Sequence, residues 1–278
     1  MNIDNNLLSK HRYVPAKIMS NFEDTVKSRK INPEIIVIHY TAGASKESSL
    51  KELIQYHEVC AHVLIGKDGE IIQMVPFNIR ANHAGQSIYR GKKNVNYFSI
   101  GIELDNWGEL FPLKDTSDNL VLNTWSGQKF TGSHYDHIDK NGNKTYWEKF
   151  TIKQLKSCFL LCEELRKIYN IKDIVGHNDI SPSRKVDPGK AFPMIELKQY
   201  VFNSKIPNFL VPDKNNIKSE ESKPISKPIS KPISTPIKQE PKISEEEFKS
   251  VIEEKESNML TKIIMYLFNF ILNLVHKH

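Results

Sequence analysis

The chain carries the sequence IVGHNDISPSRKVDPG at Ile174–Gly189. A short apolar run leads into His177, and a loop rich in Ser and Pro follows, which carries Lys185 and Asp187. Short apolar runs of this kind are typical of buried strands, and surface loops are where sites are usually built. The stretch therefore predicts a strand whose end delivers a histidine to a functional site.

A second stretch of the same kind lies closer to the N-terminus. Ile35–Ile38 is a continuous apolar run, and it also leads into a histidine, His39. Taken singly, each histidine would more often be structural than a ligand. In open α/β sheets, however, ligands bind outside the strand ends, so two strands can deliver His39 and His177 to one edge while the loop brings Asp187. Two histidines and one carboxylate, with a fourth position open, form a catalytic zinc arrangement.

Three segments together resemble the zinc-dependent N-acetylmuramoyl-L-alanine amidases. They are IVIHYTAG at 36–43, SIGIELDN at 99–106 and GHNDISPSRKVDPG at 176–189. The resemblance covers residues 33–200 and is nearest to the bacterial branch that trims anhydro-muropeptides and envelope peptidoglycan. It implies an α/β fold, with a mixed central β-sheet flanked by helices, and one Zn²⁺ ion bound by His39, His177 and Asp187. It also implies hydrolysis of the amide between N-acetylmuramic acid, or its 1,6-anhydro form, and L-alanine of the stem peptide.

Two further residues are candidates for the chemistry. Glu103 interrupts the apolar run Ser99–Leu104, and a carboxylate in such a strand is costly unless it is paired or functional. In the branch that this chain resembles, a catalytic Glu stands here; other members instead place a Tyr before the hairpin histidine, where this chain has Ala61. This departure favours Glu103 as the residue that handles the proton. Lys185 is either a solvated loop cation or, by resemblance, the group that stabilises the developing oxyanion.

Substrate contacts are predicted by the resemblance alone. His83 matches a position that contacts substrate, although the usual Trp before it is Asn82 in this chain. Arg184 is either structural or a contact for a substrate carboxylate. The remaining histidines that we considered are expected to be structural or solvated: His62, His134 and His137.

Two other function classes compete with the enzyme. Relatives that bind peptidoglycan without cutting it typically lack a full ligand set, whereas this chain keeps all three ligands together with Glu103 and Lys185. A structural zinc site is closed by four protein ligands, usually including cysteines. The three cysteines are instead irregularly spaced and are expected to be small buried hydrophobes: Cys60, Cys158 and Cys162.

Composition narrows the choice of partner. The net charge of +6 and the pI near 9.0 suit an anionic partner, such as cell-wall polymer, a membrane surface or nucleic acid. No aromatic-and-basic RNA signature and no zinc-knuckle spacing supports nucleic acid, so we expect a peptidoglycan or muropeptide partner. The N-terminus has neither a basic start nor an apolar segment, which predicts no conventional secretory signal. The expected location is the cytoplasm or the envelope of a bacterium, with the periplasm left open.

The order of predicted elements fits the fold. Strands are expected at 35–39, 62–66, 70–75, 99–104 and 174–177. The second and third should form a hairpin through Asp68-Gly69. Helices are expected after Ser45, after Thr151 and at 195–202. Residues 1–32 should form an arm with a short helix at 22–28. Residues 106–150 are polar and aromatic, and so long a segment is usually functional or has structure of its own.

The sequence predicts three parts. Residues 1–205 form the catalytic domain, residues 206–243 a flexible linker and residues 244–278 an amphipathic helix. The repeated Lys-Pro-Ile-Ser units that begin at Lys223 place a proline at every fourth position, which forbids helix and central strand. Polar residues recur at helical spacing within the apolar stretch 259–275. This pattern favours an interfacial or self-associating helix, and a membrane span is the third alternative.

The tail gives the first testable prediction. A shortened protein that ends near Lys205 should fold, bind zinc and cleave small soluble muropeptides at an unchanged rate, because the proline repeats cannot pack. The full chain should co-sediment with anionic vesicles, or run larger than a monomer in size-exclusion chromatography, and the shortened protein should do neither. Equal behaviour of both proteins in both assays would contradict the anchor.

Overall fold

A computed structural model describes residues 1–17, 29–55, 59–114 and 119–211. The predicted C-terminal helix, the linker beyond residue 211 and the short helix predicted at 22–28 lie outside these residues. Within the described part of the chain, no helix is long and apolar enough to cross a bilayer.

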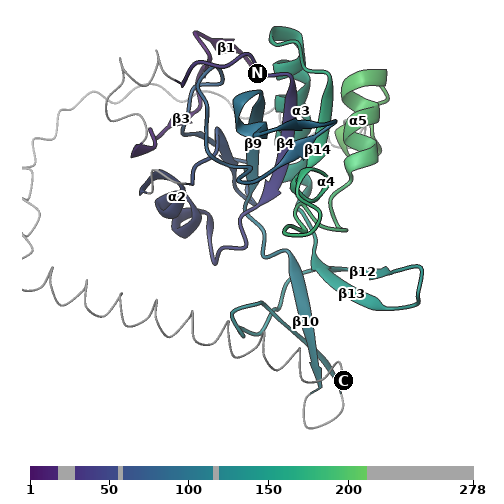
Figure 1. Cartoon of the computed structure of the whole chain (residues 1–278). Helices are drawn as coiled ribbons and strands as arrows, with labels where there is room; N and C mark the ends of the chain where they lie inside the picture. The colour runs from purple at the N-terminus through teal and green to yellow at the C-terminus, as the bar shows by residue number, and fades with distance from the viewer. Residues whose placement is uncertain (18–28, 56–58, 115–118, 212–278) are drawn as a thin grey trace, which may run out of the picture. The chain divides into compact units, whose positions relative to one another are not determined.

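The central element is a six-stranded sheet with the order β14-β4-β9-β5-β6-β3 (Figure 1). Its strands, in sheet order, are Asp173–Gly176, Ile35–Tyr40, Ser99–Leu104, Val63–Ile65, Ile71–Gln73 and Arg12–Tyr13. The β14, β4, β9 and β5 strands are parallel to one another, and β6 pairs antiparallel with β5. The predicted mixed sheet is therefore confirmed.

Two long helices lie over one face of the sheet, as Figure 1 shows: α3 (Ile152–Ile168) and α5 (Met194–Asn203). The main core includes Phe159 of α3, Leu197 of α5 and the side chains of β4 and β9 that point to this face. Alternate residues of a strand point to opposite faces. Consequently Ile36 and Ile38 enter this core, whereas His39 points to the other face.

Smaller elements cover that other face. They are α2 (Lys46–Gln55), the 3-10 helix η2 (Val95–Tyr97) and the short helix α4 (His177–Ile180). Ile35 and Val37 pack there with Val95 and Ile180. A pocket lined by His39, Glu103 and His177 lies on this face, near the ends of the parallel strands.

Local signals in the sequence explain several element boundaries. Ser45 Oγ accepts the backbone N–H of Ser48 at the start of α2, and Thr151 Oγ1 accepts the N–H of Gln154 at the start of α3. The hairpin of β5 and β6 turns at Gly69, whose φ is +85°. These caps and this turn are as predicted.

Residues 109–148 form a second sheet that the sequence did not predict in detail. Its order is β11-β10-β13-β12, all antiparallel. The strands are Glu109–Lys114 (β10), Leu120–Asn123 (β11), His134–Ile138 (β12) and Lys144–Glu148 (β13). Leu110, Leu122 and Tyr146 form its own small core. The long segment thus has structure of its own, one of the two alternatives expected for it.

The remaining short elements complete the domain. The N-terminal arm contributes β1 and β2, which pair with each other, in addition to β3, and β7 and β8 form a further hairpin. The bounds are Ile3–Asp4 for β1, Leu7–Leu8 for β2, Ile88–Tyr89 for β7, Lys92–Lys93 for β8 and Asn208–Leu210 for the 3-10 helix η3. Residues of η3 lie beyond the predicted domain boundary at Lys205, yet Phe209 and Leu210 pack on the main core. The packed domain therefore extends past Lys205.

A matched pair of shortened proteins tests this boundary. The Phe209 ring meets the buried Phe159 edge to face, with centroids 5.0 Å apart. A protein ending at Lys205 should lose about 2 kcal/mol of unfolding free energy relative to one ending at Val211. This loss corresponds to a melting temperature lower by roughly 4–8 °C, measured by circular dichroism. Identical melting temperatures would show that η3 contributes nothing to the core.

Candidate metal and catalytic site

Three neighbouring parallel strands deliver the site residues at one level. In the register of β4 and β9, His39 lies opposite Glu103. In the register of β14 and β4, Gly176 lies opposite Ile38, so His177 follows at the level of His39. Because all three strands run in the same direction, their ends meet at one edge of the sheet, as predicted.

The loop after α4 folds back and brings Asp187 to the two histidines. The backbone N–H of Asn178 donates to the Asp187 carbonyl at 2.9 Å, which ties the far end of the loop to the start of α4. Within the loop, the N–H groups of Arg184 and Lys185 both donate to the Ser181 carbonyl. This turn between Ser181 and Lys185 reverses the chain direction, so that the loop returns to the start of α4.

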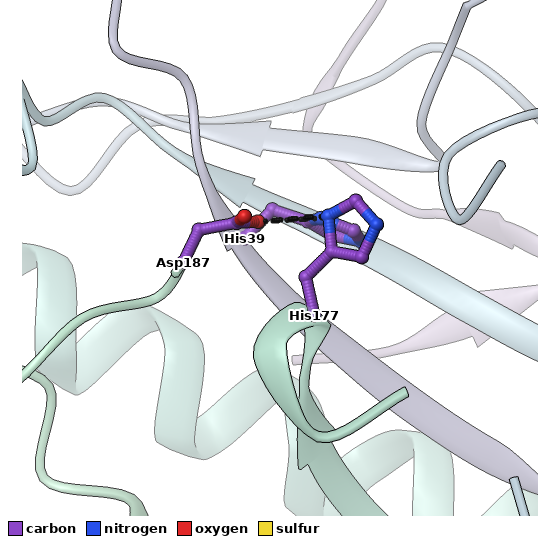
Figure 2. Close-up of side chains that lie close together, drawn as sticks. All are labelled: His39, His177 and Asp187. Atoms are coloured by element: carbon purple, nitrogen blue, oxygen red, sulfur yellow. Dashed lines mark hydrogen bonds and ion pairs between the residues drawn. The ribbon is translucent and has the colours of Figure 1, made fainter. Parts of the chain in front are cut away.

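The three candidate ligands converge in a near-equilateral triangle (Figure 2). His39 Nδ1, His177 Nδ1 and Asp187 Oδ2 each lie 3.0 Å from the other two. All three residues are buried. Within the described residues, no other group of three His, Cys, Asp or Glu side chains converges in this way.

Hydrogen bonds alone cannot satisfy this triangle. Each ring nitrogen carries at most one hydrogen and an ionised carboxylate carries none, so three contacts share at most two hydrogens. At least one contact must lack a hydrogen. A metal ion about 2 Å from each atom fits over a triangle of this size and satisfies all three lone pairs.

The electrostatics keep the ligands in their metal-binding forms. Burial lowers the pKa of His39 to about 4, against the opposing effect of Asp187, so its imidazole is neutral at neutral pH. Burial alone would raise the pKa of Asp187, but the contacts from His177 and His39 outweigh it and hold that pKa below its usual range. A neutral imidazole and an ionised carboxylate are the states that bind metals.

The triangle lies in the wall of a pocket of about 560 Å³ that also contains Glu103, Lys185 and Arg184. Glu103 is half-buried, and its Oε2 atom is enclosed without a hydrogen-bond partner among the described residues. Burial, and next the charge of Asp187, raise the pKa of Glu103 to about 8, while Lys185 acts to lower it. An unpartnered carboxyl with a raised pKa beside a metal triangle is typical of a catalytic acid or base.

Comparison with known proteins agrees with this geometry. A family model described as N-acetylmuramoyl-L-alanine amidase matches residues 29–190, more than half of the 278 residues. The chain belongs to the N-acetylmuramoyl-L-alanine amidase family. Its resemblance to that family, based on three short segments, is thereby confirmed.

Individual members of the amidase family are moderately similar to this chain. The 1,6-anhydro-N-acetylmuramyl-L-alanine amidase AmpD of Escherichia coli is 35% identical over 139 residues, which is 50% of this chain and 56% of AmpD. The N-acetylmuramoyl-L-alanine amidase AmiD of Escherichia coli is 33% identical over 176 residues, which is 60% of this chain and 52% of AmiD. The chain thus spans about half the length of the curated relatives it matches.

Solved structures of two amidases are also similar to this chain. A crystal structure of a selenomethionine derivative of AmpD has a TM-score of 0.49 at 26% identity and covers 72% of this chain and 99% of that one. The complex of AmiD from Escherichia coli with anhydro-N-acetylmuramic acid-L-Ala-D-gamma-Glu-L-Lys has a TM-score of 0.46 at 31% identity. It covers 62% of this chain and 59% of AmiD.

The residues predicted to contact substrate lie close to the metal triangle but are engaged with protein groups. Arg184 Nη2 donates to the carbonyls of Ala84 and Gln86 at 2.8 and 3.1 Å, although the residue as a whole is exposed. His83 is buried, and both of its ring nitrogens face protein atoms, His39 Nε2 and Ser99 Oγ. His83 also lines the pocket, so the substrate contact predicted for it stays a prediction.

His62, His134 and the three cysteines have the buried or exposed environments that were predicted for them. His62 is buried and bonds to backbone groups through both nitrogens. His134 is exposed on β12, beside Asp136. All three cysteines are free and buried.

Sequence reasoning missed Ser99 as part of this network. One signal was present, because Ser99, Gly101 and Glu103 alternate with apolar residues along β9. Such alternation marks a strand face that is not core.

The triangle predicts a specific loss of metal binding. His177→Ala should remove most of the bound zinc, because two remaining ligands hold the ion poorly. His62→Ala is the matched control, since it also removes a buried histidine but leaves the triangle intact. Zinc per folded protein is measured by elemental analysis after dialysis, and added zinc should raise the melting temperature of the control only. Stoichiometric zinc in His177→Ala would overturn the ligand assignment.

Proposed function

We propose that this protein is a zinc-dependent amidase. It hydrolyses the amide between the lactyl group of N-acetylmuramic acid, or of its 1,6-anhydro form, and L-alanine of the stem peptide. The observation that carries the proposal is the triangle of His39, His177 and Asp187 in a pocket that also contains Glu103 and Lys185. Membership of the amidase family supports the same reaction.

The donor set suits zinc among the common metals. Two imidazole nitrogens and one carboxylate oxygen are ligands that Zn²⁺ accepts, whereas Mg²⁺ and Ca²⁺ prefer oxygen ligands alone. His39, His177 and Asp187 would hold the ion, and three protein ligands leave a position open, as in catalytic sites. Zinc bound there supplies a Lewis acid that polarises a carbonyl and acidifies water.

Glu103 is the group that moves the proton. The unpartnered Oε2 atom is free to accept a hydrogen from the water that attacks the amide carbonyl. The same atom can then deliver that proton to the leaving nitrogen of L-alanine as the C–N bond breaks. The raised pKa of Glu103, about 8, suits a group that both takes and gives a proton near neutral pH.

Lys185 stabilises negative charge in the same pocket. Its positive charge acts on two residues of the site, because it lowers the pKa values of both His39 and Glu103. As the carbonyl carbon becomes tetrahedral, its oxygen gains negative charge, and a nearby ammonium group favours that state over the substrate. Arg184 is held to backbone carbonyls through one nitrogen, so we assign it to the pocket wall beside the substrate.

The relatives guide the choice of substrate. AmpD is named for the 1,6-anhydro substrate, and AmiD for the amide of N-acetylmuramic acid without that restriction. We therefore propose a muropeptide or peptidoglycan substrate in cell-wall turnover or recycling. The competing function is a module that binds peptidoglycan without cutting it, and a turnover assay separates the two.

The proposal predicts separate effects on metal and on chemistry. Glu103→Gln should keep its zinc but lose about 10²-fold or more in turnover, as expected when a general base is removed. Lys185→Ala should lose about 10²–10³-fold, typical of a missing oxyanion donor. Release of peptide from a soluble anhydro-muropeptide is followed by liquid chromatography.

The control for this experiment is Lys190→Ala. Lys190 is exposed, follows Asp187 closely in the chain and does not line the pocket, so its removal should leave turnover unchanged. Normal turnover in Glu103→Gln would mean that another residue is the base. Substrate binding without turnover in the zinc-loaded wild type would establish the binding module instead.

A further inference from the structure

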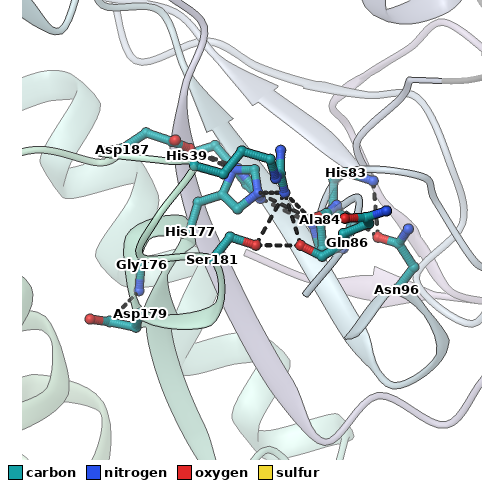
Figure 3. Close-up of polar contacts among 11 residues, drawn as sticks. His39, His83, Ala84, Gln86, Asn96, Gly176, His177, Asp179, Ser181 and Asp187 are labelled. Carbon is teal, nitrogen blue, oxygen red and sulfur yellow. Dashed lines mark hydrogen bonds and ion pairs between the residues drawn. The ribbon is translucent and has the colours of Figure 1, made fainter. Parts of the chain in front are cut away.

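His83 lies at the centre of a hydrogen-bonded chain that starts at a metal ligand and ends at the backbone. Figure 3 shows His83 with the ligand His39 and with Asn96. His83 Nδ1 lies 3.0 Å from His39 Nε2, and His83 Nε2 lies 3.0 Å from Ser99 Oγ. Ser99 Oγ lies 2.7 Å from the carbonyl oxygen of Val95. The proposed reaction makes no use of this buried histidine.

The direction of each hydrogen bond in this chain follows from the bond between Ser99 and the Val95 carbonyl. The Val95 carbonyl can only accept, so the single hydroxyl hydrogen of Ser99 is donated to it. Ser99 Oγ therefore accepts from His83 Nε2–H. A neutral imidazole has one N–H, so His83 Nδ1 must accept, and its donor is His39 Nε2–H. His39 Nδ1 is left with a lone pair, and this is the atom that belongs to the metal triangle.

Ala84, the residue that follows His83 in the sequence, fixes the tautomer of the second histidine ligand, His177. The Ala84 carbonyl lies 3.1 Å from His177 Nε2 and can only accept its hydrogen. His177 Nδ1 then also carries a lone pair towards the triangle. Arg184 Nη2 also lies 3.3 Å from His177 Nε2, but its two hydrogens are donated over shorter distances to the Ala84 and Gln86 carbonyls, at 2.8 and 3.1 Å, so His177 Nε2 keeps its own hydrogen. Adjacent residues thus fix the tautomers of both histidine ligands.

The surrounding structure holds this dipeptide firmly. Asn96 Oδ1 accepts the backbone N–H groups of both His83 and Ala84, at 3.1 and 2.8 Å. The His83 ring lies against Gly101, where a Cβ atom would overlap its Cγ atom. Glycine at this position leaves the ring space to lie between Ser99 and the metal ligand.

We propose that the dipeptide His83-Ala84, held by Asn96 and Ser99, orients both histidine ligands so that each presents an unprotonated Nδ1 to the metal. His83 is in this view a positioning residue. Groups that fix the tautomer of a ligating histidine commonly contribute 10–100-fold to metal affinity. The proposal rests on the metal site of the proposed function, but the tautomer of His39 can be measured without any metal.

Two nearly isosteric variants test the role of His83. Asn offers an oxygen close to the place of His83 Nδ1, whereas Leu fills similar space and accepts no hydrogen bond. We expect His83→Leu to lose roughly 10–100-fold in zinc affinity, measured by competition with a chromophoric chelator. His83→Asn should recover most of that loss. A purely structural role for His83 would not separate these two variants.

The matched control is His62→Leu. His62 is also buried and bonded through both ring nitrogens, but its partners are backbone groups. Its ring packs edge-on beside that of His83, with centroids 5.8 Å apart, and takes no part in the hydrogen-bonded chain from His39 to Val95. Its replacement should lower the melting temperature and leave the zinc affinity of the folded protein unchanged. Equal zinc affinities for wild type, His83→Leu and His83→Asn would overturn the proposal.

A second readout separates this proposal from the proposed function. In metal-free protein labelled with ¹⁵N-histidine, long-range ¹H–¹⁵N spectra should show His39 protonated at Nε2, and His83→Leu should weaken that preference. If wild type binds no zinc, the amidase proposal fails while this spectrum still decides the tautomer. A His39 protonated at Nδ1 in wild type would overturn the orienting role.

If His83→Leu does not fold, Ser99→Ala replaces it. This variant removes the acceptor for His83 Nε2–H and keeps both histidines, so zinc affinity should fall in the same direction by a smaller factor. Unchanged affinity together with an unchanged His39 spectrum in Ser99→Ala would likewise contradict the proposed chain.

Discussion

The site depends on the parallel pairing of three strands. Because β14, β4 and β9 run in the same direction, the register that places Ile38 beside Gly176 and His39 beside Glu103 brings the strand ends to one edge. A slip of one residue in either pairing would turn a site side chain into the main core. The apolar residues that alternate with these side chains prevent such a slip, because they must stay buried against α3 and α5.

This arrangement gives β9 two faces with different tasks. Ile100, Ile102 and Leu104 fill the main core, while Ser99, Gly101 and Glu103 serve the site. Buried polar groups are costly unless each finds a partner. Along the strand, Ser99 completes the chain from His83 and Gly101 leaves space for the His83 ring. Glu103 Oε2, in contrast, has no hydrogen-bond partner among the described residues. A carboxyl left without a partner beside satisfied neighbours is where chemistry is expected.

The sequence allowed prediction of residues whose roles follow from local pattern. Apolar runs that lead into a histidine predicted His39 and His177 as site residues. A capping residue predicted the start of α3, and a turn sequence predicted the hairpin of β5 and β6. The role of His83 could not be predicted, because its bond to His39 joins residues 44 positions apart and depends on how a loop packs over β9. The sheet at 109–148 was missed because its strands mix polar and aromatic residues, so their alternation is weak. The contact of Phe209 with Phe159 was not predicted, because Phe209 lies in a proline-containing segment that was interpreted as linker.

The insertion at 109–148 contacts two loops of the site, although none of its described residues lines the pocket. The Trp125 indole N–H donates to the Ala42 carbonyl at 2.7 Å, on the loop that follows the His39 strand and lines the pocket. The ring of Trp147 lies where a side chain at Gly189 would be, on the loop that carries Asp187. Two tryptophans of the insertion therefore brace the two loops that flank the metal ligands. Since loops are otherwise the mobile parts of a domain, such bracing limits the movement of these two loops, one of which carries Asp187.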